Sequence, residues 1–200
     1  MSQLYERGLP NRFGEQRFGR AGDNVARAQQ LLAGAVPRRD RRGSRFLLSA
    51  LQAAVFNRVL DLREAALDTV EVGEVAMVHE SGGCFVVEDA AREAPRATAF
   101  EISATGPIFG TRLLAPQGPA AECERAALAQ YGVSLENLRV PRGIKLRGAR
   151  RPLRVQPRDA FAEAEGGALV LGFSLPPGSY ATVLVEELLA PEAIGSPGPG

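Results

Sequence analysis

The chain has 200 residues, 45% of them hydrophobic, and a formal net charge of +1. This is enough for one large domain or two small ones, each with its own core. Cys84 and Cys123 lie far apart without CxxC spacing, and His79 is the only histidine, so the sequence indicates neither a disulfide framework nor a zinc site. No apolar run approaches the roughly 20 residues that span a bilayer, and residues 1–7 lack a secretory-signal pattern. We therefore expect a cytoplasmic protein without a membrane partner.

Positive charge is concentrated in two parts of the chain. Between residues 1 and 45, ten arginines face only four acidic residues, whereas the stretch from Asp61 to Glu101 is mostly acidic. Lys145 is the only lysine, which a GC-rich genome could also produce, so the clustering of the arginines is more informative than their identity. The second basic run consists of Lys145, Arg147, Arg150, Arg151, Arg154 and Arg158. Both clusters are candidate contacts for an RNA phosphate backbone.

Residues 10–23 form a predicted loop that combines glycines, arginines and two aromatic rings. The glycines allow close approach of the backbone to a ligand, and Arg12, Arg17 and Arg20 could bind phosphates. Phe13 and Phe18 offer faces on which a base could stack. This pattern favours RNA binding. Composition is equally compatible with the two rings anchoring the loop while the arginines are solvated.

Periodicity and turn residues predict helices in the first third of the chain. A helix is expected over residues 24–33, with Asp23 as N-cap and Gly34 as the stop. Apolar residues at helical spacing predict a longer helix, capped by Ser44 and running to about Ala66.

Short β-branched runs separated by glycines predict a β-rich region between Val70 and Leu114. The strands expected there are 70–72, 75–78 and 84–87. Further along, we expect helices at 120–130 and 179–189 and strands at 153–155 and 168–175. Residues 191–200 are rich in Pro and Gly and are predicted to be disordered.

Several motifs, in order along nearly the whole chain, resemble the TruD family of tRNA pseudouridine synthases. The segment Asn11–Gly19 is close to the Asn-Tyr-Phe-Gly-x-Gln-Arg-Phe-Gly motif of that family, with Arg12 in place of Tyr. The others lie at residues 39–41, 46–50, 56–57, 101–103, 106–110, 148–152, 173–182 and 187–188.

The resemblance implies an α+β fold in two parts. The family has a catalytic domain built on a mixed, largely antiparallel sheet with helices, interrupted by an inserted α/β TRUD-type domain. Here residues 1–36 and 159–189 would belong to the catalytic domain, 37–158 to the insertion and 190–200 to the tail. The motifs around Asn11 and Tyr180 would both lie outside the insertion, and we expect them to converge on one pocket.

The resemblance also implies the reaction and its site. Members isomerise uridine to pseudouridine in tRNA, favouring a uridine of the D arm, and the chemistry needs no cofactor and no metal. By residue-wise correspondence, Asn11, Phe13 and Tyr180 would lie in the substrate pocket, with Tyr180 replacing the Phe of some members. The candidate contacts with the RNA backbone are Arg17, Arg20, Arg38, Arg39, Arg41, Arg42, Arg150 and Arg151.

The nucleophile of the family is the Asp of a Lys-Asp pair well upstream of the Asn-x-Phe-Gly motif, and this sequence contains no Lys-Asp. Asp40, between Arg39 and Arg41, is expected to form ion pairs, and no other Asp has the catalytic context of the family. We therefore expect the C-terminal portion of the enzyme, inactive alone, with the N-terminal half as a missing partner. The alternative is a noncatalytic RNA-binding protein or one half of a split synthase.

Overall fold

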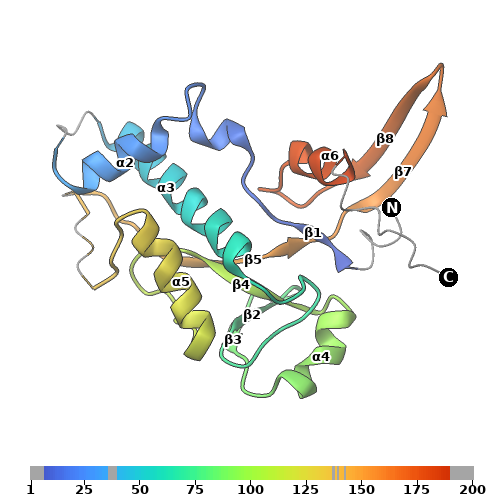
Figure 1. Cartoon of the computed structure of the whole chain (residues 1–200), viewed down its shortest axis with the longest axis horizontal. Helices are drawn as coiled ribbons and strands as arrows, with labels where there is room; N and C mark the ends of the chain where they lie inside the picture. The colour runs from blue at the N-terminus through green and yellow to red at the C-terminus, as the bar shows by residue number, and fades with distance from the viewer. Residues whose placement is uncertain (1–6, 36–39, 137, 139, 142, 190–200) are drawn as a thin grey trace.

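The computed structural model describes residues 7–35, 40–136, 138, 140–141 and 143–189 (Figure 1). The predictions for Arg38, Arg39 and the tail at 191–200 concern residues outside these ranges. Helices and antiparallel sheets alternate along the chain, which confirms the predicted α+β class. Within the described parts of the chain, no helix is both long and apolar enough to cross a membrane.

Two helices near the N-terminus pack against each other. Helix α2 spans Asn24–Leu32 and helix α3 spans Arg41–Leu62. Asp23 occupies the predicted N-cap position of α2, although its side chain makes no capping hydrogen bond. The cap predicted for the longer helix is wrong, because Asp40 and not Ser44 caps α3, by accepting from the Gly43 amide. Asp40 can do this because its backbone is extended immediately before the first helical turn. Helix α3 therefore begins three residues before Ser44, and it ends at Leu62 rather than near Ala66.

A four-stranded antiparallel sheet with strand order β3-β2-β4-β5 lies beside α3 (Figure 1). The strands are β2 (Val75–Val78), β3 (Cys84–Val86), β4 (Ile102–Ile108) and β5 (Ala149–Pro152). A Cβ on Gly106 of β4 would lie 2.8 Å from the ring of Phe56. Gly106 therefore permits close packing of the strand on α3, rather than ending a strand as a turn residue would.

The segment between Val70 and Leu114 differs from its prediction in two respects. Residues 70–72 form a loop rather than a strand. Helix α4 (Ala90–Thr98) was not predicted, and it is capped by the Asp89 side chain, which accepts from the amide of Arg92. Pro95 lies inside this helix, and a proline there argues against a helix when only the sequence is read.

One hydrophobic core joins α2, α3, the sheet and helix α5, which spans Gly118–Gln130 and confirms the helix predicted at 120–130. Ala28 and Leu31 of α2 and Phe56 of α3 belong to this core together with Ile102 and Leu153. Helix α2 thus packs on residues beyond the predicted domain boundary at 37, and that boundary stays a prediction.

A second, smaller core lies where the ends of the described chain meet. Strand β1 (Leu9–Pro10) pairs with β6 (Arg154–Val155), and Leu9 and Val155 are buried with Leu184 of helix α6 (Ala181–Leu189). This strand and helix match the expectations for 153–155 and 179–189. The hairpin of β7 (Arg158–Glu165) and β8 (Ala168–Ser174) projects from the body of the molecule (Figure 1). The prediction included β8 and missed β7.

Candidate functional site

The structure brings together the two motif loops that the sequence places far apart. The Ser179 Oγ lies 3.3 Å from Asn11 Oδ1, and the rings of Phe13 and Tyr180 pack edge to face with centroids 6.0 Å apart. A Cβ on Gly14 would lie 3.1 Å from the Tyr180 ring, so glycine lets the first loop pass beneath this ring. The expected convergence of the two motifs is therefore present.

Asn57 of α3 fixes the backbone of the first loop. Its Oδ1 accepts from the Phe13 amide at 2.9 Å, and its Nδ2 donates to the Phe13 carbonyl at 2.9 Å. The Phe13 ring then meets the ring of Phe56 edge to face, with centroids 5.5 Å apart. The pair Phe56-Asn57 belongs to the family-like motifs, but its sequence alone does not indicate this contact.

The Asn11 side chain is enclosed and not open to a ligand. The residue is 6% exposed, and its Nδ2 donates to the Pro152 carbonyl at 3.0 Å. Its Oδ1 accepts from Arg151 and from the hydroxyl of Ser179. All polar atoms of this side chain have partners within the protein, so its contacts favour a role in holding the loops over direct contact with uracil.

Arg151 of β5 lies at the centre of these contacts. Its Nη2 donates to the Asn11 carbonyl at 3.0 Å and to the Gly178 carbonyl at 2.9 Å, and its guanidinium carbon lies 4.2 Å from the Phe13 ring centroid. Burial lowers the pKa of Arg151 to about 10, because desolvation disfavours the charged form. The interaction with Tyr180 raises this pKa and so opposes the shift, and the nearby charge of Arg17 lowers it.

Positive charge and aromatic surface therefore coincide at this cluster. The guanidinium carbon of Arg17 lies 5.9 Å from the Phe13 centroid, and the Arg17 Nε is buried with no hydrogen-bond partner among the described residues. The cavity between the two loops has a volume of about 10 Å³. This is room for about one water and not for a uracil, so a base would have to lie against the outer side of the cluster.

The remaining predicted backbone contacts divide into exposed and buried residues. Arg20, Arg41 and Arg42 are exposed. Arg150, in contrast, is buried at 9% exposure, forms an ion pair with Glu124 and donates to the Leu114 carbonyl. Its guanidinium is already occupied inside the protein, so the structure favours a structural role for Arg150 over phosphate contact.

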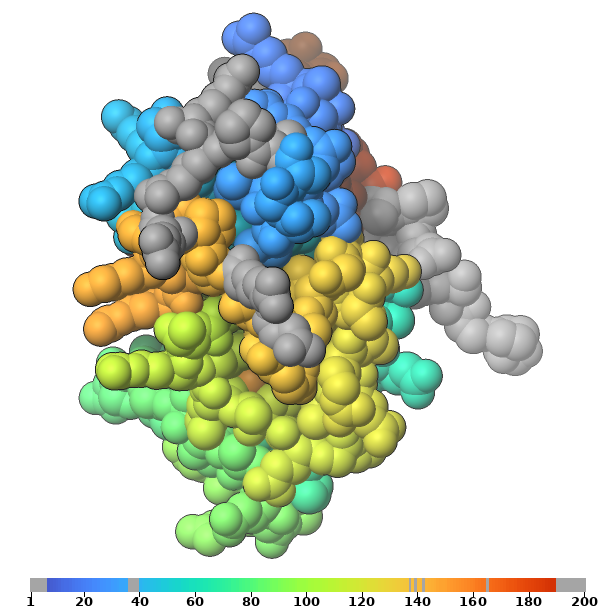
Figure 2. Space-filling model, turned by 90° about the vertical axis from the view of Figure 1, so that its left-hand side faces the viewer, coloured from blue at the N-terminus to red at the C-terminus, as the bar shows by residue number. Residues whose placement is uncertain are grey.

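The second basic run is likewise not a continuous surface strip. Arg154 is 1% exposed and donates to Ser103 Oγ and to three backbone carbonyl groups. Lys145 and Arg147 are exposed. The start of α3 and the segment near residue 147 both lie on the face shown in Figure 2, where long side chains project from the surface.

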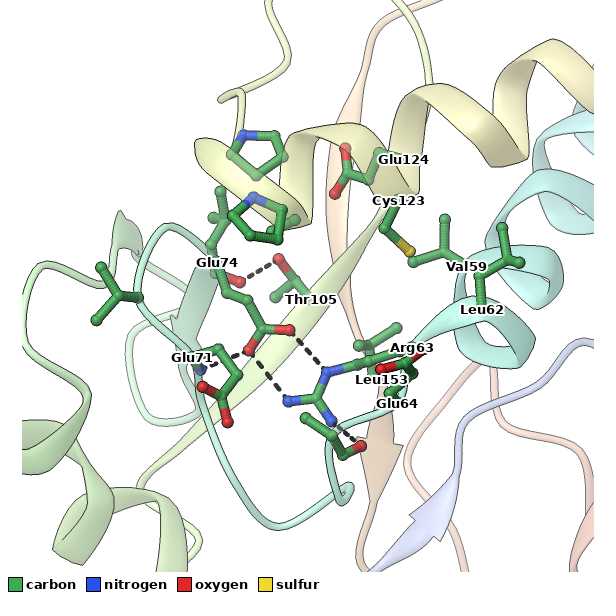
Figure 3. A pocket seen from close by; sticks show the side chains of 16 residues that line it. Val59, Leu62, Arg63, Glu64, Glu71, Glu74, Thr105, Cys123, Glu124 and Leu153 are labelled. Atoms are coloured by element: carbon green, nitrogen blue, oxygen red, sulfur yellow. Dashed lines mark hydrogen bonds and ion pairs between the residues drawn. The ribbon is translucent and has the colours of Figure 1, made fainter.

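A larger cavity of about 830 Å³ lies between the end of α3, α5 and the sheet (Figure 3). Its charged groups are largely paired with one another: Arg63 binds both carboxylate oxygens of Glu74 and donates to three backbone carbonyl groups, and Glu124 binds Arg150. Burial raises the pKa of Glu124, although the hydrogen bond and the charge of Arg150 oppose that shift. No arginine in its lining is free for phosphate, and none of the predicted site residues lines it.

All six aspartates are engaged elsewhere in the structure. Asp61 forms an ion pair with Arg12 at 2.6 Å, and Asp40 and Asp89 cap helices. Of the other three, Asp23 forms an ion pair with Arg27, Asp68 forms one with Arg7, and Asp159 accepts a hydrogen bond from Ser174. No aspartate lines the small cavity between the motif loops. Among the described residues, no group of three His, Cys, Asp or Glu side chains is placed to hold a metal.

Comparison with known proteins identifies relatives along most of the chain. The family model described as tRNA pseudouridine synthase D (TruD) matches residues 23–188, a range that includes Tyr180 and Arg151 but not Asn11 or Phe13. The chain is 42% identical over 97% of its length to a tRNA pseudouridine synthase D of Thermus thermophilus, covering 53% of that protein. It is 35% identical over 93% of its length to that of Geotalea daltonii, covering 63% of it.

The fold is similar to a crystal structure of a protein assigned as tRNA pseudouridine synthase D (TruD) from Methanosarcina mazei. The TM-score is 0.69 at 21% identity, and the match covers 92% of this chain and 61% of the other. The chain thus spans about half to two thirds of the length of these relatives. The family-model match over most of the chain shows that this protein belongs to the TruD family.

Proposed function

We propose that this chain acts in pseudouridine formation in tRNA by binding tRNA and holding a uridine against the cluster of Phe13 and Tyr180. The observation that carries the proposal is the convergence of the two motif loops on one aromatic cluster with two guanidinium groups beside it. Membership of the TruD family supports tRNA as the RNA and the cytoplasm as the place of action.

The chemistry matches what such a surface can supply. In the isomerisation, the N1–C1′ glycosidic bond breaks and a C5–C1′ bond forms, while N1 gains a proton and C5 loses one. Before this, the base must leave the RNA stack, which costs a few kcal/mol. Stacking on an aromatic ring returns about 1–3 kcal/mol per base, so one or two contacts of this kind offset much of the cost.

Exposed arginines would hold the RNA backbone around the flipped base. Arg20, Arg41 and Arg42 are exposed on the surface, and Arg17 lies at the edge of the aromatic cluster. Phosphate contacts of this type give affinity and register but no sequence preference. Stacking on Phe13 and Tyr180 accepts any base, so the preference for uridine would come from the Tyr180 hydroxyl, the polar group that this cluster can offer to the edge of the base.

We further propose that the chain alone binds tRNA without isomerising it. The basis is the position of its carboxylates: each Asp has a structural partner and none lines the cavity between the motif loops. The alternative of a noncatalytic RNA-binding protein predicts the same binding, but no preference for a particular uridine.

Binding of a tRNA transcript to the full chain, measured by fluorescence anisotropy, tests the proposal. A second transcript with cytidine at the D-arm uridines should bind more weakly. Tyr180→Ala should weaken the binding of both transcripts, whereas Tyr180→Phe, which keeps the ring and loses only the hydroxyl, should keep most of the affinity and lose the difference between them. Equal binding of both transcripts by the unmodified chain would contradict the placement of a uridine against this cluster. Pseudouridine detected by chemical mapping of the bound tRNA would contradict the inactivity of the chain alone.

A further inference from the structure

Arg151 connects three segments that are separate along the chain. From β5, its side chain reaches the backbone of Asn11 in the first motif loop and the carbonyl of Gly178 in the second, and it covers a face of Phe13. Gly178 has a φ of +87°, a conformation that glycine adopts readily and that orients this carbonyl within the turn. Arg151 therefore links the two loops directly, in addition to the contact of Ser179 with Asn11 and that of the Phe13 and Tyr180 rings.

The guanidinium is bound by neutral groups only. Within the described part of the chain, no carboxylate forms an ion pair with Arg151, whereas Arg12, Arg63 and Arg150 each have one. Its partners are two carbonyl oxygens, the amide oxygen of Asn11 and the aromatic face of Phe13. A planar fork with several donors can satisfy this set at once, which the compact ammonium group of a lysine cannot.

We propose that Arg151 is a positioning residue, which sets the relative placement of Phe13 and Tyr180 for a flipped uridine, and not a contact with the RNA backbone. The inference deepens the proposed function and rests on it for the identity of the ligand. Arg151 is half-buried and already donates hydrogen bonds to both loops. It would therefore influence a bound nucleotide indirectly, through the positions of Phe13 and Tyr180.

The first experiment needs no RNA and therefore tests the role of Arg151 independently of the ligand. We compare ¹⁵N NMR spectra of the unmodified chain, Arg151→Lys and the control Arg147→Lys, which changes an exposed arginine of the same basic run. Arg151→Lys should shift both the side-chain amide of Asn11 and the backbone amide of Tyr180, because each loop loses its hydrogen bonds to the guanidinium. Signals of α5, such as that of Ala127, should stay in place and report that the variant is folded.

The second experiment separates positioning from phosphate contact by the preference for the uridine transcript, and the salt dependence of binding checks that the positive charge is retained. Arg151→Lys keeps the positive charge, so a phosphate contact would survive with affinity and uridine preference nearly unchanged. Positioning predicts an unchanged slope of log K against log salt, together with about a tenfold loss of preference for the uridine transcript. Arg147→Lys should alter neither quantity.

The outcomes of the two experiments are distinct. Unshifted signals of Asn11 and Tyr180 in Arg151→Lys would overturn the inference, as would a full uridine preference in that variant. If the unmodified chain shows no uridine preference, the proposed function fails, and the uridine-positioning role of Arg151 fails with it. In that case the NMR comparison still decides whether Arg151 holds the loops together.

Discussion

Asn57→Ala should loosen the first motif loop without unfolding the protein. The side chain makes two hydrogen bonds of 2.9 Å to the backbone of Phe13, one in each direction. Each such bond contributes about 0.5–1.5 kcal/mol net, so their loss should cost about 1–3 kcal/mol. Alanine recovers roughly half a kcal/mol through its higher helix propensity within α3. The expected loss in the free energy of unfolding is therefore about 0.5–2.5 kcal/mol.

Urea denaturation gives the change in stability, and hydrogen exchange gives its location. The Phe13 amide donates to Asn57, so its exchange should become faster in Asn57→Ala. Asn57→Asp keeps an acceptor for this amide but loses the donor to the Phe13 carbonyl, so it should leave the amide protected while still lowering stability. Arg45→Ala, at an exposed position of the same helix, is the control and should leave both measurements near their original values.

The reasoning would be refuted by an Asn57→Ala variant that matches the stability of the unmodified chain and keeps slow exchange at Phe13. That result would mean that the loop is held mainly by the contacts of its ring with Phe56, at 5.5 Å between centroids, and that the hydrogen bonds contribute little. Loss of structure throughout the chain would equally contradict a local effect.

Three further predictions concern the rest of the molecule. Gly110→Ala should lower the free energy of unfolding by about 1–3 kcal/mol or more in urea denaturation, because the new Cβ would lie 2.5–2.6 Å from backbone atoms. The control Gly83→Ala should be tolerated, because its Cβ would meet only a side-chain oxygen, at 3.3 Å. Arg150→Met should lower the free energy of unfolding by about 3–5 kcal/mol, because it leaves Glu124 buried and unpaired. The double variant Arg150→Met with Glu124→Leu should recover part of that loss in the same assay. Burial, and to a lesser extent the charge of a nearby arginine, lowers the pKa of His79 below its ordinary value of 6.5. As the pH falls below about 6.5, the unfolded chain therefore gains a proton that the folded chain does not, and the free energy of unfolding should decrease. His79→Asn should remove this part of the pH dependence of the unfolding midpoint.

The sequence predicts the type of element correctly where a local pattern of residues determines it. The apolar spacing in α3 and α5 and the β-branched runs of β2 and β3 led to the correct element types. Strand β7 was missed because Arg158–Glu165 is rich in alanine and charge, a composition with low strand propensity. Helix α4 was missed because Pro95 lies within it. In both cases the tertiary setting outweighs the local preference.

The candidate site was predictable only in part. Resemblance to a family located Phe13 and Tyr180, and the structure places them in contact. The difference between Arg150 and Arg151 could not be read from a basic run. Neighbouring residues of a strand point to opposite faces of the sheet, so Arg150 turns to the carboxylate of Glu124 and Arg151 to the ring of Phe13. Recognising β5 as a strand would have separated the two roles.

The way the motif loops are joined has a consequence for the order in which the protein forms. Arg151 and Ser179 contact Asn11 across 140 and 168 residues of chain, so the first loop leaves the ribosome well before these partners are synthesised. Contacts between residues so distant in sequence form late and slow folding, because the intervening loop must close first. The α-helical and sheet core can assemble from nearer contacts before then. The aromatic cluster should therefore become ordered after the core of helices and sheet, and a peptide carrying the first motif alone should not reproduce it.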